Sequence, residues 1–201
     1  MLIEIDPARP NPHLVQKVIS ALKDGGVIVY PTDTCYGIGC DIFSKSAIEK
    51  VYQIKAISKF VPLSFVCADL SDISRYAVVT NFSYRILKRH LPGPYTFVLP
   101  GSREVPKMML TKRRTVGIRI PDHPVCMAIV KGLGNPLISA SASIADGPTW
   151  SDPREIAESL GDRVAYVVDS GIIPAEPSSV VSLIDDEITI MRKGKGDVSV
   201  F

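Results

Sequence analysis

A short polar segment follows an apolar run near residue 30. Residues 27–40 read VIVYPTDTCYGIGC. The hydroxyls of Thr32 and Thr34 and the carboxylate of Asp33 could hold a small polar ligand at the end of a strand. The glycines at 37 and 39 would let the backbone come close to that ligand. A turn held by local aspartate and threonine hydrogen bonds is the alternative interpretation.

A second group of hydroxyls lies in the segment ISASASI. Ser139, Ser141 and Ser143 alternate along it, so in a strand they would face one side together. Hydroxyls and backbone N–H groups at that place could hold a phosphate group. Small residues packed into a crowded strand are the alternative.

Two of the predicted strands contain an arginine, one inside the strand and one near its end. Arg119 lies in the apolar run VGIRI, on the opposite face from Ile118 and Ile120. A buried arginine costs desolvation energy unless a carboxylate or phosphate meets it, so this position predicts either an anionic ligand or a structural ion pair. Arg192 ends another strand and is followed by Lys193 and Lys195, for which a solvated basic terminus is the alternative.

The sequence contains no familiar catalytic motif. It has no nucleophile elbow, no paired metal-ligand histidines, no Walker lysine loop and no dinucleotide glycine fingerprint. The histidines are scattered and are expected to cap helices or lie on the surface, and no metal site is predicted. The four cysteines lack the spacing of zinc sites and are expected to be buried. An enzyme of this kind would work mainly by holding ligands together in a positive, hydroxyl-lined cleft.

Periodicity and caps predict the elements that position these residues. Helices are expected after the N-caps Asn11, Ser44, Asp122 and Asp152, the last in a capping box with Glu155, and in one further segment at 81–91. Apolar runs predict strands at 27–30, 62–67, 95–99, 114–120, 136–142, 164–169, 178–185 and 187–194. Because the last three strands have no helix between them, we expect an α/β or α+β domain built on a mixed, partly parallel sheet.

Composition favours one globular domain over residues 1–201. Hydrophobic residues make up 46% of the chain, which is enough for a sizeable core. A formal net charge of +2 is too small to demand a nucleic-acid partner, although a local basic patch is compatible with it. No basic start leads into an apolar run, and no apolar stretch reaches about 18 residues, so a cytoplasmic protein without a membrane partner is expected.

Five motifs in order resemble the YrdC/YciO/Sua family. They read GGVIVYPTDTCYGIGCD, PGPYTFVLPG, TVGIRIPDHP, PLISASA and PSSVVSLID, and the resemblance extends from about residue 11 to the end. It implies a twisted open sheet with a positive concave cavity. It also implies synthesis of threonylcarbamoyl-AMP from L-threonine, bicarbonate and ATP with magnesium, for the threonylcarbamoyl modification of adenosine in tRNA. No tightly bound cofactor is expected, and family members are also described as binding double-stranded RNA.

The resemblance assigns roles to individual positions. Catalytic roles fall on Arg119 and Lys55. The residues expected to bind threonine are Thr32, Thr34, Arg119 and Ser179, the last with Ser178 beside it. The residues expected to bind the nucleotide are Lys55, Lys59, Ser139, Ser141, Ser143 and Arg192. RNA would be met by a basic surface that includes Lys107, Lys112, Arg113 and Arg114.

The chain departs from the family pattern at several of these places. Ala56, Ile57 and Ser58 follow Lys55, so the arginine of a Lys-x-Arg motif is missing, and Val66 stands where synthases often have histidine. In the serine strand, Ala140 and Ser143 replace threonine and asparagine. The amino-acid sequences of several segments resemble the YciO branch of the family more than the YrdC branch. Three functions therefore remain in view: threonylcarbamoyl-AMP synthesis, action on the adenylate such as its hydrolysis, and binding of structured RNA without chemistry.

Overall fold

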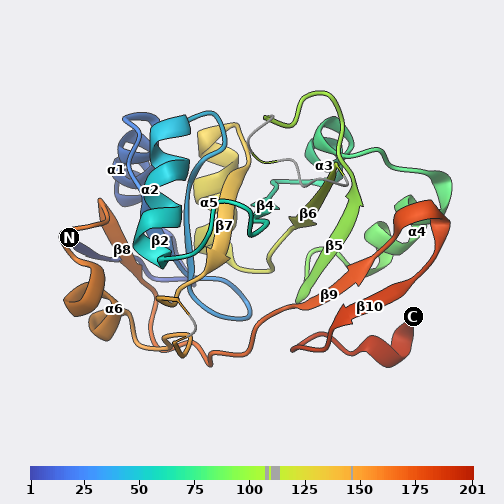
Figure 1. The fold of residues 1–201 in the computed structure, drawn as a ribbon. Coiled ribbons are helices and arrows are strands. Elements are labelled where there is room, and N and C mark those ends of the chain that lie inside the picture. Colours follow the sequence, from blue (N-terminus) through green and yellow to red (C-terminus); the bar gives the residue numbers. More distant parts are fainter. Residues whose placement is uncertain (107–108, 110–113, 146) are drawn as a thin grey trace.

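A single mixed sheet runs through the whole molecule (Figure 1). The computed structural model describes residues 1–106, 109, 114–145 and 147–201. The strands are β1 (Leu2–Glu4), β2 (Ile28–Tyr30), β3 (Gly37–Asp41), β4 (Ser64–Val66), β5 (Tyr95–Pro100), β6 (Thr115–Arg119), β7 (Leu137–Ser141), β8 (Tyr166–Asp169), β9 (Ser179–Ser182) and β10 (Thr189–Arg192). Their order across the sheet is β1-β8-β2-β3-β7-β4-β6-β5-β9-β10, with parallel and antiparallel pairs. The expected mixed, partly parallel sheet is confirmed.

Helices cover both faces of this sheet. They are α1 (Pro12–Lys23), α2 (Lys45–Lys55), α3 (Leu70–Tyr76), α4 (Asn81–His90), α5 (Pro124–Leu133) and α6 (Pro153–Leu160). In Figure 1, α1, α2 and α5 lie by the half of the sheet that contains β1, β8, β2, β3 and β7. The helices α3 and α4 lie by the half that contains β4, β6, β5, β9 and β10. The two termini lie toward opposite ends of the sheet.

The helix starts follow from local capping chemistry. The Asn11 side chain accepts a hydrogen bond from the backbone N–H of His13 at 2.9 Å, and Ser44 caps α2 through the N–H of Ala47 at 3.4 Å. The Asp152 side chain caps α6 by accepting from the backbone N–H of Arg154 at 2.8 Å. The described hydrogen bonds include none from the Asp152 N–H to the Glu155 carboxylate, so the predicted capping box is not formed among them. The predicted cap at Asp122 is wrong: α5 begins one residue later, after His123, and no side chain caps it.

Three elements carry no periodic signal in the sequence. The short strand β1 lies parallel to β8 at the sheet edge, and α3 is a helix of only seven residues that is capped by Asp69. The strand β3 contains two glycines and pairs with both β2 and β7. Its pairing depends on contacts with distant parts of the chain, so neither composition nor alternation predicts it.

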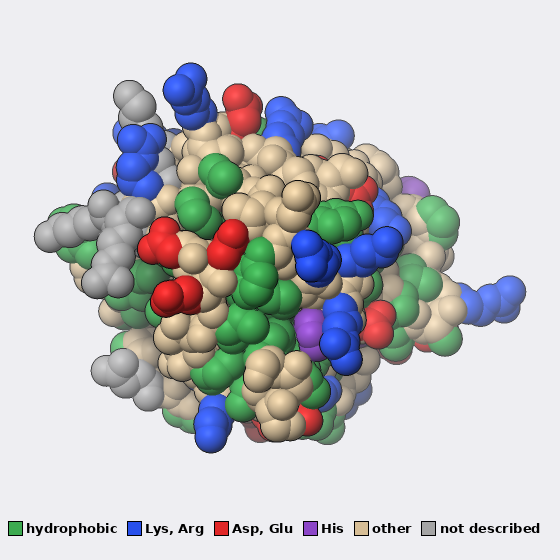
Figure 2. All heavy atoms as spheres, turned by 90° about the vertical axis from the view of Figure 1, so that its right-hand side faces the viewer, with side chains coloured by type: hydrophobic (Ala, Val, Ile, Leu, Met, Phe, Trp, Pro, Cys, Tyr) green, Lys and Arg blue, Asp and Glu red, His purple; other side chains and the backbone are tan. Residues whose placement is uncertain are grey.

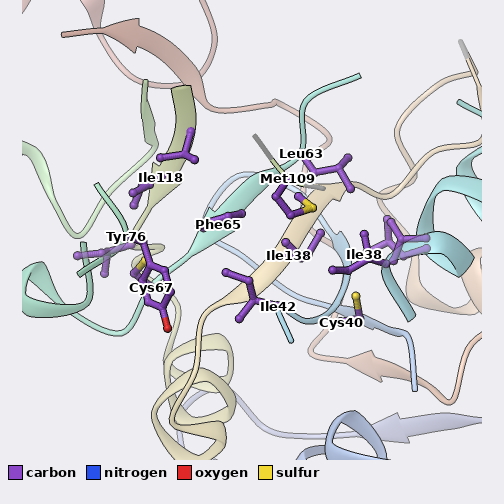
Figure 3. Packing of buried hydrophobic residues seen from close by; sticks show 14 of the residues in the cluster. Ile38, Cys40, Ile42, Leu63, Phe65, Cys67, Tyr76, Met109, Ile118 and Ile138 are labelled. Atoms are coloured by element: carbon purple, nitrogen blue, oxygen red, sulfur yellow. The ribbon is translucent and has the colours of Figure 1, made fainter. Parts of the chain in front are cut away.

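Two hydrophobic clusters lie on opposite faces of the sheet. The smaller one joins α1 and α5 to Ile28 and Tyr30 of β2. The larger one joins α2, α3, α4 and α6 to the other face of the central strands. Figure 3 shows Phe65, Ile118 and Ile138 of this larger cluster, and they come from the three neighbouring strands β4, β6 and β7.

The last three strands do not form one meander. After β8 the chain crosses to the other end of the sheet, where β9 pairs in parallel with β5 and in antiparallel fashion with β10. Strand β10 is an edge strand, and Met191 on it is 61% exposed. Figure 2, which looks onto this side of the molecule, shows hydrophobic side chains as a band between acidic and basic groups.

The glycines of β3 are required by close packing of the sheet. A Cβ atom at Gly39 would collide with the carbonyl oxygen of Ile138 on β7, and it would lie 3.2 Å from the ring of Tyr30. A Cβ atom at Gly37 would lie 2.9 Å from Cζ of Tyr30. The aromatic ring of Tyr30 therefore occupies the space that side chains at 37 and 39 would need. The expectation that these glycines admit a ligand is replaced, for Gly39, by this packing role.

We expect Gly39→Ala to lower the free energy of unfolding by about 3 kcal/mol, because the added methyl group has no room and forces β3 away from β7. Gly134→Ala is the matched control. Gly134 has a positive φ of 78°, but an added methyl group would have no atom within 4 Å, so only the backbone preference of about 1 kcal/mol opposes the change. Urea denaturation of both variants measures the difference, and equal losses would contradict the packing role.

Candidate functional site

A cavity of about 430 Å³ lies on the concave side of the central strands. Its floor is built from alternate residues, because one face of each strand points into it while the other face enters the larger hydrophobic cluster. Among the described residues, the strand positions that follow this alternation are Ser64, Val66, Thr96, Val98, Thr115, Gly117, Arg119, Ser139, Ser141, Val180 and Arg192. Gly37 of β3, Ala140 of β7 and Met191 of β10 also line the cavity, the last two beside a residue of that set. Further walls come from Thr32, Cys35, Lys55, Ile57, Val61, Pro62, Leu63 and Ser178.

The charge of this lining has one sign. It includes Lys55, Arg119 and Arg192, and none of the described lining residues is an aspartate or glutamate. Most of the other polar groups are hydroxyls, and Cys35 adds a thiol. Since lysine and arginine only donate hydrogen bonds and a hydroxyl can also donate, the cavity suits a ligand rich in anionic oxygens.

Arg119 is more deeply buried than Arg192, the other arginine that a strand contributes to the cavity. It is 8% exposed, and its Nη1 donates to the hydroxyl of Thr34 at 2.7 Å. Its Nη2 forms an ion pair with the carboxylate of Asp33. The Nε atom has no hydrogen-bond partner among the described residues. The predicted structural ion pair is therefore present, while part of the guanidinium donor capacity stays unused.

The segment after β2 is organised around a threonine hydroxyl. Thr32 Oγ1 donates to the carbonyl of Cys35 at 2.6 Å and accepts from the N–H of Thr34 at 3.2 Å. It also lies 3.1 Å from the hydroxyl of Thr34. The predicted turn with local hydrogen bonds is thus present, and the same turn places Thr32 and Cys35 on the cavity wall. The two interpretations of this segment are compatible.

Lys55 reaches the cavity from the end of α2 and is 6% exposed. Its Nζ donates to the carbonyl of Ser141 at 2.7 Å, and to the carbonyl and the hydroxyl of Ser143 at 3.0 Å each. Burial lowers the pKa of Lys55, because desolvation disfavours its charged form. All three ammonium hydrogens are directed to the chain itself, so Lys55 holds the end of β7 and supplies positive charge to the cavity.

The C-terminal segment completes the opposite wall. Arg192 donates from Nη2 and Nε to the carbonyl of Ser178 at 2.8 and 3.1 Å, and the Ser178 hydroxyl lies 2.8 Å from that of Thr96. Ser179 does not face the cavity, since its hydroxyl donates to the carbonyl of Gly196 at 2.6 Å. Ser178 therefore occupies the wall position at which the sequence placed Ser179.

The structure separates two other predicted nucleotide residues from the cavity. Lys59 is paired with Glu49 at 3.6 Å, its side chain is 65% exposed, and it is not among the described lining residues. Ser143 follows the end of β7, where its hydroxyl accepts from Lys55 instead of facing the cavity. Its alternation with Ser139 and Ser141 ends because the strand stops at Ser141.

Most of the predicted RNA-binding residues lie outside the part of the chain that the structure describes. Lys107, Lys112 and Arg113 lie outside the described residues. Arg114 is exposed, its carbonyl accepts from the N–H of Gly101 at 2.8 Å, and it is not among the described residues of the cavity wall. Binding of RNA by this group stays a prediction.

Several site residues carried no signal that sequence reasoning used. Tyr30 donates a hydrogen bond to the hydroxyl of Ser139 at 2.6 Å, and Cys35 donates to the hydroxyl of Ser141 at 3.8 Å. His123 does not act as a cap: its Nδ1 is buried with no partner among the described residues, and burial lowers its pKa. Tyrosine at the end of an apolar strand reads as core, so its hydroxyl contact could not be located without the fold.

Three further observations concern metal ligands, membrane spans and cysteines. In the part of the chain that the structure describes, no group of three or more histidine, cysteine, aspartate or glutamate side chains is placed to hold a metal ion. No described helix is long and apolar enough to cross a membrane. All four cysteines are free and buried, as the sequence predicted.

Comparison with known proteins places this arrangement in a family. The Sua5_yciO_yrdC family model, described as "Telomere recombination", matches residues 20–194. The chain belongs to the Sua5/YciO/YrdC family. It is 38% identical over 199 residues to the Escherichia coli protein named "Uncharacterized protein YciO", covering 98% of this chain and 97% of that protein. It is 32% identical over 157 residues to a threonylcarbamoyl-AMP synthase of Vibrio vulnificus, covering 77% of this chain and 84% of the synthase.

Solved structures of this family have the same fold. The crystal structure of E. coli YciO superposes with a TM-score of 0.94 at 37% sequence identity, covering 98% of this chain and 97% of YciO. The crystal structure of P. abyssi Sua5 complexed with L-threonine superposes with a TM-score of 0.91 at 23% identity, covering 96% of this chain and 57% of Sua5. The family resemblance of the sequence and the expected open sheet are confirmed.

The ion pair between Arg119 and Asp33 makes a stability prediction. We expect Asp33→Asn to lower the free energy of unfolding by about 3 kcal/mol, because it leaves a buried cation without its counter-charge. Glu49→Gln removes the same charge from the exposed pair with Lys59 and should cost less than about 0.5 kcal/mol. Denaturant titration of the two variants tests this, and an Asp33→Asn protein as stable as the Glu49→Gln protein would refute it.

The contacts of Lys55 lead to a second prediction about stability. We expect Lys55→Met to destabilise the fold by about 2 kcal/mol, because the carbonyls of Ser141 and Ser143 lose their donor. Lys50→Met is the control, since Lys50 is an exposed residue of the same helix. Thermal unfolding should show a clear loss for the first variant only. Equal unfolding temperatures would show that Lys55 does not hold the end of β7.

Proposed function

We propose that this chain is an ATP-dependent threonylcarbamoyl-AMP synthase-like enzyme that serves the modification of tRNA in the cytoplasm. In the reaction, the amino group of L-threonine is carboxylated by bicarbonate, and the resulting carbamate oxygen attacks the α-phosphorus of ATP. Threonylcarbamoyl-AMP, pyrophosphate and water are the products. Every substrate carries carboxylate, carbonate or phosphate oxygens.

One observation carries this proposal: a nearly buried arginine, already fixed by an aspartate and a threonine, lies on the wall of a cavity whose described lining has no acidic residue. Arg119 is 8% exposed, and Asp33 and Thr34 each hold one of its terminal nitrogens. A structural ion pair alone would not need this placement on a cavity wall. A fixed guanidinium that faces an acid-free space is suited to bind a carboxylate or carbamate.

The other residues would contribute position and electrostatic stabilisation. Lys55 and Arg192 line the same cavity as Arg119 and would stabilise the charge that develops on the phosphate during displacement. The hydroxyls of Ser139, Ser141 and Ser178 would orient the phosphate and carboxylate oxygens. Because no described carboxylate lines the cavity, we propose that magnesium enters as the ATP complex, held by the phosphates.

Relatives support the substrate class. The Vibrio vulnificus relative is named threonylcarbamoyl-AMP synthase, and P. abyssi Sua5 has been crystallised with L-threonine. The cavity volume of about 430 Å³ falls within the range of about 300–1,000 Å³ that is typical of small-molecule sites. Thr32 and Arg119 are the residues proposed to meet threonine, with Ser178 in place of Ser179. Thr34 is not among the described lining residues and is 1% exposed, so we propose that it acts by holding Arg119.

We expect the purified protein to release pyrophosphate only when ATP with magnesium, L-threonine and bicarbonate are all present. Arg119→Ala should lower turnover by about 100-fold or more, as removal of a fixed charge-stabilising donor does in other enzymes. Arg163→Ala is the control, because Arg163 is an exposed arginine just after α6 and is not among the described cavity residues. Unchanged turnover in Arg119→Ala would refute the role of Arg119.

The alternatives are separate outcomes of the same assay. If the protein releases no pyrophosphate but converts added threonylcarbamoyl-AMP to AMP, the synthase proposal fails and action on the adenylate replaces it. If neither reaction occurs and structured RNA binds with a steep salt dependence, binding without chemistry replaces it. The acid-free cavity is more specialised than phosphate binding on a surface requires, which favours the enzyme.

A further inference from the structure

The side chain of Tyr30 extends from the smaller hydrophobic cluster to Ser139 on the cavity wall. The residue is fully buried and belongs to the hydrophobic cluster below α1 and α5. Its ring crosses the neighbouring strand β3 over the two glycines, since Cβ atoms added at 37 and 39 would lie 2.9 and 3.2 Å from ring atoms. At the far side of β3 its hydroxyl meets Ser139 on β7 at 2.6 Å.

The direction of this hydrogen bond follows from burial. In the described part of the chain, Ser139 is the only hydrogen-bond partner of the Tyr30 hydroxyl, so the tyrosine proton would be left unsatisfied unless it is donated to the serine oxygen. Ser139 is half-buried and lines the cavity, where its own proton can reach a ligand. Tyr30 as donor therefore leaves Ser139 with a hydrogen that faces the cavity.

Tyr30 also keeps this role over a wide pH range. Burial raises the pKa of its phenol far above the ordinary value, because desolvation disfavours the phenolate. The hydroxyl thus remains protonated, and so a donor, at neutral pH. A serine hydroxyl that accepts such a bond is polarised and donates more strongly to its next partner.

We propose that Tyr30 is a positioning residue that fixes Ser139 as a hydrogen-bond donor to an anionic oxygen of the ligand. This inference rests on the proposed function, which supplies a phosphate of ATP as that oxygen. Ser139 then selects ligands that accept at this point over ligands that donate. The glycines of β3 belong to the same device, since side chains there would exclude the ring.

The test compares two buried tyrosines. Tyr30→Phe keeps the ring over β3 and removes only the hydroxyl, whereas Tyr36→Phe removes a hydroxyl that donates to the backbone of Gly171 at 2.7 Å, away from the described cavity wall. Calorimetric titration with magnesium-ATP should show affinity about five- to tenfold weaker for Tyr30→Phe. Tyr36→Phe should bind ATP as the wild type does.

A double-mutant cycle separates positioning from general packing. Ser139→Ala should weaken ATP binding at least as much as Tyr30→Phe, and the double variant should bind no more weakly than Ser139→Ala alone. Thermal unfolding gives a second, ligand-free readout. Ser139→Ala leaves the Tyr30 hydroxyl buried without an acceptor, so adding Tyr30→Phe should raise the unfolding temperature of the Ser139→Ala protein.

The outcomes distinguish the two proposals. Wild-type affinity in Tyr30→Phe, or losses that multiply in the double variant, would overturn the positioning role while leaving the proposed function in place. A lower unfolding temperature for the double variant than for Ser139→Ala would overturn it as well. A wild-type protein that does not bind magnesium-ATP would overturn the proposed function together with this inference.

Discussion

The buried positive charge of Arg119 is the constraint that the rest of the site satisfies. A guanidinium that is 8% exposed on a central strand needs a fixed counter-charge, and Asp33 provides it from the turn after β2. That turn must in turn be held in place, which the hydroxyl of Thr32 does through three local contacts. The ion pair thus joins the turn after β2, in one half of the sheet, to β6 in the other half.

The lining around this pair follows from the alternation of the strands. The central strands turn apolar side chains such as Phe65 and Ile118 toward the larger cluster, and toward the cavity they turn hydroxyls such as that of Ser64 together with Val66 and Arg119. Gly117 contributes to the open space, because a Cβ atom there would lie 3.0 Å from the hydroxyl oxygen of Ser64. The cavity is therefore a place where glycine and small hydroxyl side chains on one face of the sheet leave room between the basic residues.

Local signals in the sequence were enough for much of the fold. Asn11 and Ser44 cap their helices as predicted, because capping depends on residues only two or three positions away. The facing of Arg119 also followed from alternation alone. Its partner is 86 residues distant in the chain, however, so the choice between an anionic ligand and a structural ion pair required the fold.

The errors at the site have a common physical origin. Ser143 was placed with Ser139 and Ser141 on the assumption that the strand continued, but the strand ends at Ser141 and the Ser143 hydroxyl accepts from Lys55. Ser179 was preferred over Ser178 although the backbone turns it toward Gly196. Gly39 looked like room for a ligand because a sequence does not show which neighbouring atoms fill the space. Each depends on a contact between different segments, 17 residues apart for Ser179 and Gly196 and 88 for Lys55 and Ser143, which the strand pattern does not contain.

The crossover between β8 and β9 has a kinetic consequence. These strands are consecutive in the chain yet stand near opposite ends of the sheet, and Val180 on β9 and Arg192 on β10 are parts of the cavity wall. The two halves of the sheet must therefore join before any ligand finds its full set of contacts. Such late, long-range closure makes folding slow relative to a chain of local contacts. A bound ligand would act on the finished structure alone, so it would lengthen the lifetime of the native state and leave the rate of folding unchanged.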